Sequence, residues 1–453
     1  MRILLPCLLI LVFSASTCRG ASVLDLPVRE TRLANGLHVI VHEDHTLPLV
    51  AVNLLYRVGS RDEQPRRTGF AHLFEHLMFM GTTRAPLKMF DAWMEAAGGS
   101  NNAWTSEDYT DYHELGPPGL LPLFLWLEAD RLERLGLEID QAKLDLQRDV
   151  VRNERRQSIE NVPYGTVELR VSELMFPEAH PYHHPVIGSH EDLEAAQVAD
   201  VRAFFAEHYL PSNASLVIAG DVSPDQAFAL AKRSFGWLPS APEPRRVIAA
   251  AQPTLPGVVR ETIADQVELT KVLMVFHAPA HFSAGDAELD LLASALATGK
   301  SSRLYRALVL EQAIAVSVGV SQSSQPLSSL FTVDVVLRSG VDADQAEAAI
   351  DALLAQVVRD GISGEELDRA RNGFESRFVG RLQSLEARAI ALNLYHAERG
   401  EADWAARDLA RYSAATVDGV RVWAQRTLTL DARCIIRVVP APAPVEPLQG
   451  AQP

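Results

Sequence analysis

Two halves of this chain of 453 residues repeat the same pattern of segments. The strand-like segments 52–59 and 270–277 lie 218 residues apart, and segments 214–219 and 432–437 have the same spacing. A self-similar pattern at one fixed spacing indicates duplication of a structural unit. The sequence therefore predicts an α+β fold made of two homologous halves.

A proline-rich segment separates the two copies. Residues 239–257 contain several prolines, which remove backbone donors and disfavour helix, so we predict a linker there. This places a first domain at 27–238 and a second at 258–440. The last residues, 441–453, are low in complexity and are expected to be disordered. Two domains joined in this way can face each other.

The N-terminus is typical of a secretory signal peptide. An apolar stretch at 3–13 follows Met1-Arg2 and precedes small and polar residues, which predicts a signal peptide at 1–20 and an exported protein, periplasmic or secreted. That stretch is too short to span a bilayer, and no later stretch approaches the roughly 18 apolar residues needed, so we expect no integral membrane segment. Lipidation at Cys18 stays open as an alternative. After cleavage only Cys434 remains, so we expect no intrachain disulfide.

Composition restricts the class of partner. The chain is 47% hydrophobic and 22% charged, as expected of an ordinary folded protein, and its net charge is −16. No basic run or basic and aromatic interleaving is present that would neutralise phosphates. We therefore expect no binding to nucleic acid.

The run from His72 to His76 carries the clearest chemical signal. On a helix, His72 and His76 are four residues apart and share a face with Glu75. Two neutral imidazoles can bind a metal, and the carboxylate is then free to take a proton from a water whose pKa the metal lowers. The order H-x-x-E-H is a signature of zinc hydrolases. The alternative is a set of ordinary core or surface groups on an apolar helix.

A hydrolytic zinc site usually needs a third protein ligand, and Glu154 is the best candidate. It follows His76 by 78 residues and lies in a stretch from about 140 to 159 that has the pattern of a charged amphipathic helix. Taken alone, this segment favours a solvated carboxylate on the helix surface.

Three separated blocks resemble the pitrilysin-type metallopeptidases, the family of insulin-degrading enzyme and mitochondrial processing peptidase. The blocks are 69–82, which contains the histidine motif, 98–105, and 153–165. The resemblance implies that one Zn²⁺ per chain is bound by His72, His76 and Glu154, with Glu75 as the general base. One departure from the family pattern is Gln147, where many relatives carry a glutamate. The resemblance therefore implies no role here for a carboxylate at this position, outside the metal ligands.

The resemblance also implies an architecture. Each half would be a sheet flanked by helices, and the two would enclose a chamber with zinc on the wall of the first. Asn102, Ala103 and Thr105 would lie in an edge strand that receives the substrate backbone as an added strand. The alternatives are a surface turn at 98–102 and an ordinary strand at 103–112.

The second half does not repeat the ligand set. At a spacing of 218 the motif positions become Asp290, Ala293 and Ser294, which cannot rebuild the zinc site, so only the first half is expected to be catalytic. At this length the chain resembles the short form of the family, which implies a homodimer or a heterodimer with a related subunit lacking zinc ligands.

Other motif residues are interpreted as structural. We read Arg303 and Tyr305 as packing residues, and Tyr164 as a support for the helix that bears Glu154. The predicted function is a zinc metalloendopeptidase that hydrolyses unfolded peptides inside the chamber. Two alternatives stay open: a non-catalytic zinc-binding subunit of a peptidase heterodimer, and an exported peptide-binding protein similar to a chaperone.

Overall fold

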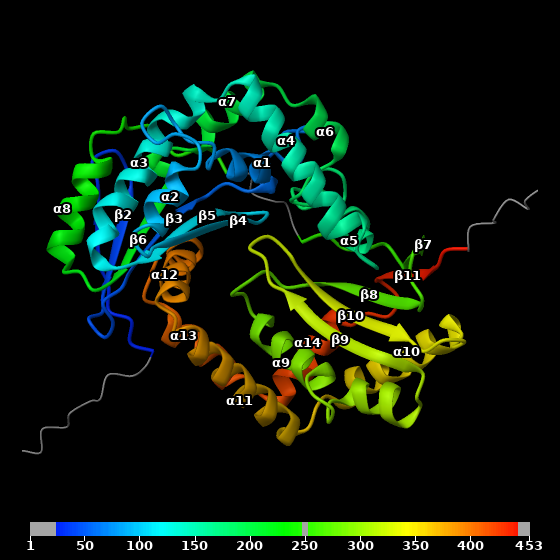
Figure 1. Cartoon of the computed structure of the whole chain (residues 1–453). Coiled ribbons are helices and arrows are strands. Elements are labelled where there is room, and N and C mark those ends of the chain that lie inside the picture. The colour runs from blue at the N-terminus through cyan, green and yellow to red at the C-terminus, as the bar shows by residue number, and fades with distance from the viewer. Residues whose placement is uncertain (1–23, 247–251, 443–453) are drawn as a thin grey trace, which may run out of the picture.

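The computed structural model describes residues 24–246 and 252–442 (Figure 1). The predicted signal peptide at 1–20 lies outside the described residues, as do 247–251 of the predicted linker and all but the first two residues of the predicted tail. None of the helices in the described ranges combines the length and the apolar character that crossing a membrane requires.

Within the described ranges, the first half is built on a sheet of six strands in the order β1-β2-β6-β3-β5-β4. The pair β2 and β6 is parallel, and the other neighbours are antiparallel. The strands are β1 Arg29–Arg32, β2 His38–Glu43, β3 Val50–Tyr56, β4 Ser100–Thr105, β5 Thr110–Gly116 and β6 Ala214–Gly220. Strand β4, which contains Asn102, Ala103 and Thr105, lies at one edge.

The second half is built on a sheet of five strands in the order β7-β11-β8-β10-β9. The strands are β7 Val259–Asp265, β8 Lys271–Ala278, β9 Ala315–Ser323, β10 Ser329–Leu337 and β11 Cys434–Pro440. Without β1, the first sheet has the same order and the same pattern of one parallel and three antiparallel pairs. The predicted α+β fold of two homologous halves is confirmed.

The spacing of 218 residues is wrong for the last strand of the repeat. It would pair Leu216 with Cys434, but Leu216 packs under the helices of its own half whereas Cys434 lies on the opposite face of its sheet. Ile435, at a spacing of 219, faces the helices as Leu216 does. A shift of one residue turns a strand side chain to the other face, so sequence similarity alone did not fix this register.

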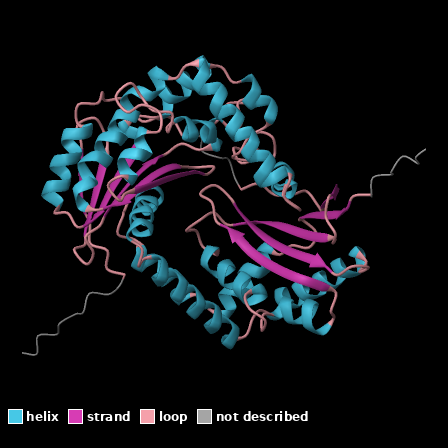
Figure 2. Cartoon of the chain, in the orientation of Figure 1, coloured by secondary structure: helices cyan, strands magenta, loops and turns pink. Residues whose placement is uncertain are grey.

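Helices cover both sheets (Figure 2). Those of the first half are α1 Phe70–Leu77, α2 Met89–Glu95, α3 Leu121–Glu138, α4 Gln141–Arg155, α5 Thr166–Met175, α6 His190–Ala195, α7 Val198–His208 and α8 Pro224–Phe235. Those of the second half are α9 Asp286–Ala297, α10 Ala343–Asp360, α11 Gly364–Arg381, α12 Leu385–Arg399, α13 Ala405–Ala414 and α14 Val417–Thr427.

The strands β3 and β6 of the first sheet and β8 and most of β11 of the second are buried on both faces, which explains their nearly continuous apolar sequences. In β3, Val52 and Leu54 face the core formed with the helices of the first half, while Ala51 faces the opposite way. In β8, Met274 faces the helices of the second half and Val275 faces the opposite way. Alternate residues of one strand therefore belong to two different cores.

The second face of each sheet is covered by a helix from the other half of the chain. Helix α12 packs on β3 and β6 of the first sheet, and α5 packs on β8 and β11 of the second. Buried Asn393 of α12 donates to Asn53 Oδ1 at 2.6 Å and to the Ser215 carbonyl at 3.0 Å. The predicted linker thus separates the two sheets in sequence. Each sheet, however, is covered by a helix that lies on the other side of the linker in sequence.

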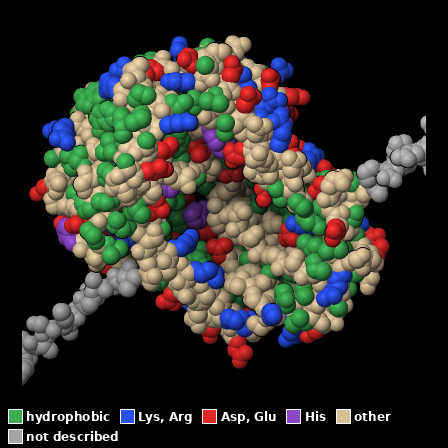
Figure 3. Space-filling model, in the orientation of Figure 1, with side chains coloured by type: hydrophobic (Ala, Val, Ile, Leu, Met, Phe, Trp, Pro, Cys, Tyr) green, Lys and Arg blue, Asp and Glu red, His purple; other side chains and the backbone are tan. Residues whose placement is uncertain are grey.

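The two exchanged helices hold equivalent places in the repeat. Helix α4 packs on α1 and leads into α5, as α11 packs on α9 and leads into α12. Between the halves the surface is hollowed, with histidine side chains visible inside the hollow (Figure 3). The exchange therefore joins the two halves around a shared interior.

Candidate metal centre

Helix α1 presents the motif histidines because its other face is buried. Leu73, Phe74 and Leu77 pack into the core of the first half, which leaves His72 and His76 on the remaining face. The helix begins after Gly69, whose φ of 87° suits glycine. The carboxylate of Glu63 accepts hydrogen bonds from the N–H groups of Gly69 and Ala71 at 2.9 and 2.7 Å. These bonds satisfy donors that the first turn leaves free.

Helix α4 brings Glu154 to the same place. The predicted helix at about 140–159 is present: α4 begins after Asp140, whose side chain accepts from Lys143 N at 2.9 Å, and a π-helical segment, Arg156–Glu160, continues it. Arg148 holds the helix to the first half by donating to the Leu193 carbonyl at 2.8 Å. Glu154 thus lies at the end of a helix that is capped and anchored.

The three predicted ligands converge. His76 Nε2 lies 3.3 Å from His72 Nε2 and 3.2 Å from Glu154 Oε2, and His72 Nε2 lies 3.8 Å from the same oxygen. Nitrogen ligands about 2.0–2.1 Å from a tetrahedral zinc ion are about 3.3 Å apart. The two imidazole planes are 88° apart, so lone pairs in those planes can point to one ion. The residues present therefore fit a zinc ion.

The protonation states suit a metal site. Burial lowers the pKa of His72 to about 4, so this imidazole is neutral at pH 7. Burial also disfavours the charged form of His76, but the hydrogen bond to Glu154 and the charge of Glu75 together raise its pKa. The same hydrogen bond lowers the pKa of Glu154. The site therefore contains a carboxylate and one imidazole ready to bind a cation, and a second imidazole paired with that carboxylate.

Glu75 lies beside the three ligands, but its hydrogen-bond partner is a residue outside that set. Its carboxylate accepts a hydrogen bond from the Thr105 hydroxyl of β4. Burial raises the pKa of Glu75, while the bond from Thr105 lowers it. A partly buried carboxylate with a raised pKa next to a metal site is suited to taking and returning a proton. Thr105, expected only to bind substrate, thus also contacts the proposed base.

Gln147 contacts a ligand through an amide. It lies on α4, donates to Met80 Sδ at 2.8 Å, and forms a hydrogen bond with His76 that raises the pKa of that histidine. A hydrogen bond from a residue that is not itself a metal ligand orients the ring of the ligand that it contacts. Position 147 therefore places a neutral amide beside His76.

A cleft of about 610 Å³ opens over these residues. The predicted Ala103 and Thr105 of β4 line it, but Asn102 is not among its lining residues. The Asn102 side chain instead accepts from the N–H of Ala103 at 2.9 Å. Lining residues that sequence reasoning missed are Trp104, Glu107, Ile159, Glu168, Leu169, Ser172, Pro185, Val186 and Ile187. Trp104 and Ile159 lie within the blocks that carry the family resemblance, and Glu107 closely follows the block 98–105, whereas the other lining residues belong to no motif.

Of the structural roles predicted for Arg303 and Tyr164, the one for Tyr164 needs a change. Arg303 donates to both carboxylate oxygens of Glu366 at 2.6 Å, which fits the packing role expected of it. Tyr164 follows the helix with Glu154 but binds the second half: its N–H donates to Asp265 Oδ2 at 2.9 Å and its hydroxyl to the Leu269 carbonyl at 2.7 Å. Tyr164 therefore attaches this segment to the other sheet.

Within the described ranges, a second set of three potential ligands consists of Glu30, His38 and His396. The rings of His38 and His396 are stacked, with centroids 4.1 Å apart and planes 15° apart. Lone pairs in two nearly parallel planes do not converge on one ion. The positive charges of Arg57 and Arg32 also act on His396. These residues do not fit a metal as they stand.

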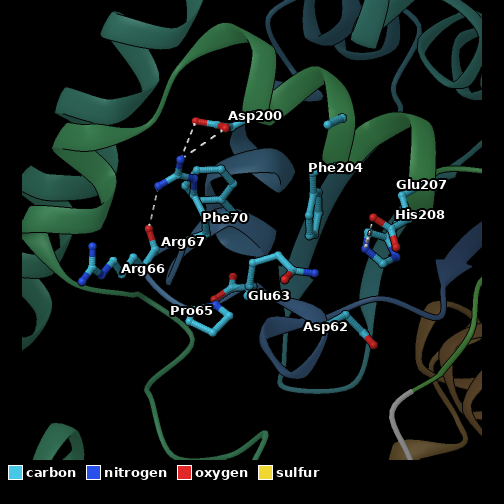
Figure 4. A pocket seen from close by; sticks show the side chains of 12 residues that line it. Asp62, Glu63, Pro65, Arg66, Arg67, Phe70, Asp200, Phe204, Glu207 and His208 are labelled. Atoms are coloured by element: carbon cyan, nitrogen blue, oxygen red, sulfur yellow. Dashed lines mark hydrogen bonds and ion pairs between the residues drawn. The ribbon is translucent and has the colours of Figure 1, made fainter.

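A separate pocket lies next to α1 and α7 (Figure 4). It is lined by Glu63, which caps α1, and by Arg67, which pairs with Asp200 at 3.3 Å. No residue of this pocket belongs to a potential ligand set in the part of the chain that the structure describes. Its polar groups hold the start of α1.

The corresponding positions of the second half are occupied by other chemistry. Asp290 accepts from the Tyr412 hydroxyl at 2.6 Å, and Ala293 is buried. Asp290, Ala293 and Ser294 belong to no potential ligand set among the described residues.

Comparison with known proteins identifies the family. Residues 38–180 match the model described as Insulinase (Peptidase family M16), and residues 195–374 match the model described as Peptidase M16 inactive domain. The zinc protease PqqE of Helicobacter pylori is 30% identical over 363 residues, which cover 79% of this chain and 81% of that protein.

Solved structures agree with this match. A protease from Helicobacter pylori has a TM-score of 0.85 at 26% identity, covering 92% of this chain and 100% of that one. The first half of the periplasmic protease PqqL from Escherichia coli, at 20% identity and a TM-score of 0.74, shares the fold over 92% of each chain. The predicted resemblance is thus confirmed, and the chain belongs to peptidase family M16.

Proposed function

We propose that this chain is a zinc-dependent endopeptidase that hydrolyses unfolded peptides in the hollow between its halves. One observation carries the proposal: His72, His76 and Glu154 place three ligand atoms 3.2–3.8 Å apart, with Glu75 beside them. Relatives named zinc proteases support the choice of metal. None of these three ligands lies in the segment that matches the inactive domain.

Each residue then has a defined task. His72, His76 and Glu154 would hold one zinc ion, and when bound that ion would act as a Lewis acid toward a carbonyl and would lower the pKa of water. Glu75 takes the proton of the attacking water and passes it to the leaving amine. Thr105 orients Glu75 through its hydroxyl.

Strand β4 receives the substrate. Among the described residues β4 pairs with β5 alone and forms a sheet edge, so its other side offers backbone groups to an extended peptide. Ala103 and Thr105 line the cleft, and Asn102 would contact the peptide from the same strand. Because only an extended segment can add to a strand edge, the substrates are unfolded peptides.

Export and pairing with a second chain are part of the proposal. The N-terminal sequence is typical of a signal peptide, and PqqL, which shares the fold, is named as periplasmic. The partner would be a second copy or a related subunit without zinc ligands. An idle structural subunit or a metal-free peptide-binding protein would instead show no turnover.

The test is cleavage of a mixture of unstructured peptides by the purified mature chain, read by mass spectrometry with and without a chelator. We expect cleavage that the chelator abolishes and zinc restores. Glu75→Gln should keep its zinc and lose at least about 100-fold in rate. Glu154→Ala should lose zinc occupancy, whereas Asp149→Ala, an exposed carboxylate on the same helix, should not. No cleavage by the zinc-loaded chain, alone or with a copurified partner, would contradict the proposal.

A further inference from the structure

The cleft over the metal ligands has walls from both halves of the molecule. Helix α1 and strand β4 form one side and pack in the core of the first half. Glu168, Leu169 and Ser172 of helix α5 form the other side. Helix α5 belongs to the first half in sequence, but its own packing partners are in the second.

The face of α5 opposite the cleft is buried against the second sheet. Val167 and Met175 pack in one cluster with Leu273 and Val275 of β8. Among the described residues, α5 makes its main contacts with β8 and β11. A helix follows the sheet that buries its apolar face, because separating them exposes apolar surface to water.

Two polar contacts fix α5 along this sheet. Arg170 forms a bidentate pair with Glu261 of β7, with Nε and Nη2 lying 2.8 and 2.9 Å from the two carboxylate oxygens. Bidentate pairs constrain direction as well as distance. Just before α5, the N–H of Tyr164 donates to Asp265, at the end of the same strand.

The connection of α5 to the first half is a tight turn. It follows the π-helical segment Arg156–Glu160, and Tyr164 adopts a left-handed φ of 65°. A side chain at Gly165 would come within 2.1 Å of the Ile159 carbonyl oxygen. Helices α4 and α5 are therefore separate bodies, and the direction of α5 is set by the sheet beneath it.

We infer that α5 is a wall of the peptide cleft carried by the second half, and that Glu261 and Asp265 are positioning residues that set the width of this cleft. This inference rests on the proposed function. Peptide affinity then depends on two carboxylates that touch neither the peptide nor the metal ligands. When the halves separate, the cleft itself opens.

The test uses the full chain in the Glu75→Gln background, where a labelled unstructured peptide binds without being cut. Adding Glu261→Gln removes the charge that Arg170 contacts on β7 and leaves the pair of Arg170 with Glu173 inside α5. We expect the Kd of the peptide to rise about fivefold, within the range carried by indirect contacts, with zinc content unchanged. In the chain with native Glu75, KM should rise while kcat changes little.

Arg260→Gln is the matched control. Arg260 is the neighbour of Glu261 on β7 and pairs with Glu347 of α10 at 2.9 Å, away from α5. A rise in Kd for Glu261→Gln alone supports the inference. Equal affinities for both variants, or an equal loss in both, overturn it.

Amide hydrogen exchange tests, without any peptide, whether Glu261 holds α5 on the second sheet. Glu261→Gln should speed exchange in residues 166–175 and leave α1 unchanged, and Glu261→Asp, which keeps the charge, should lie nearer to wild type. Unchanged exchange in α5 overturns the inference even if peptide affinity falls. If the Glu75→Gln parent binds no peptide, the proposed function fails, and exchange still tests the mounting of α5.

Discussion

At the scale of single residues, Thr105 connects the edge strand to the proposed base. Thr105→Val removes the hydrogen bond that lowers the pKa of Glu75, so burial would raise this pKa further. Because the base must be ionised, activity at low pH should fall and the acid limb of kcat/KM should move to higher pH. The pH profile of peptide cleavage checks this. An unchanged acid limb would show that another group controls it.

The site residues that could be predicted from the sequence alone are those whose positions follow from local helix geometry. His72, Glu75 and His76 share one turn of helix, so their convergence follows from helical spacing. Glu154 could be placed only by resemblance, because 78 residues separate it from His76 and helix packing brings it there. No sequence pattern marked Glu168 and Leu169 as residues that line the cleft, because nothing in the local sequence indicates which sheet α5 packs on.

At the scale of elements, Glu366 holds the start of α11. Burial would raise its pKa, but hydrogen bonds from Arg303 and Ser363 lower it to about 2. Its lowered pKa stabilises the fold above the ordinary pKa of about 4.3, and this contribution is lost as pH falls through about 2. Glu366→Gln should cost about 1 kcal/mol at pH 7 and less below pH 4.

Thermal unfolding at several pH values measures this difference. Glu365→Gln is the control, since Glu365 is exposed in the same helical turn. A Glu366→Gln penalty that stays constant down to pH 2 would show that charge does not cause it.

Among the elements, helices were easier to anticipate than strand ends. The charged helix at about 140–159 matches α4 and its π-helical extension because capping and periodicity are local signals. The alternative of an ordinary strand at 103–112 is wrong: β4 ends at Thr105 and β5 begins at Thr110, with Ser106 N bonded to the Tyr109 carbonyl at 2.8 Å. The turn between them contains Ser106 and Asp108, which favour turns but are weaker sequence signals than glycine or proline.

At the scale of the whole molecule, the two halves hold each other without the linker. Cutting a chain that carries a protease site inserted between Ser240 and Arg246 should yield two fragments that co-elute in gel filtration and separate only in denaturant. Their cohesion comes from α12 on the first sheet and α5 on the second.

Asn393→Asp in the cut protein should promote separation, because it buries a charge beside Asn53 and Ser215. Separate elution of the cut wild-type fragments would mean that the linker alone holds the halves. Sequence patterns indicated two homologous halves but not this exchange, since an apolar helix face looks the same whichever sheet it covers.

The exchanged helices also suggest how such a chain arose. A lone ancestral half would leave one face of its sheet bare, and two copies could cover each other by trading the same helix. Tandem fusion of the genes for that swapped homodimer would leave the arrangement seen here. One copy would then have kept the residues that can hold a metal, and the sheet of the other copy would have become the support for helix α5, which lines the cleft.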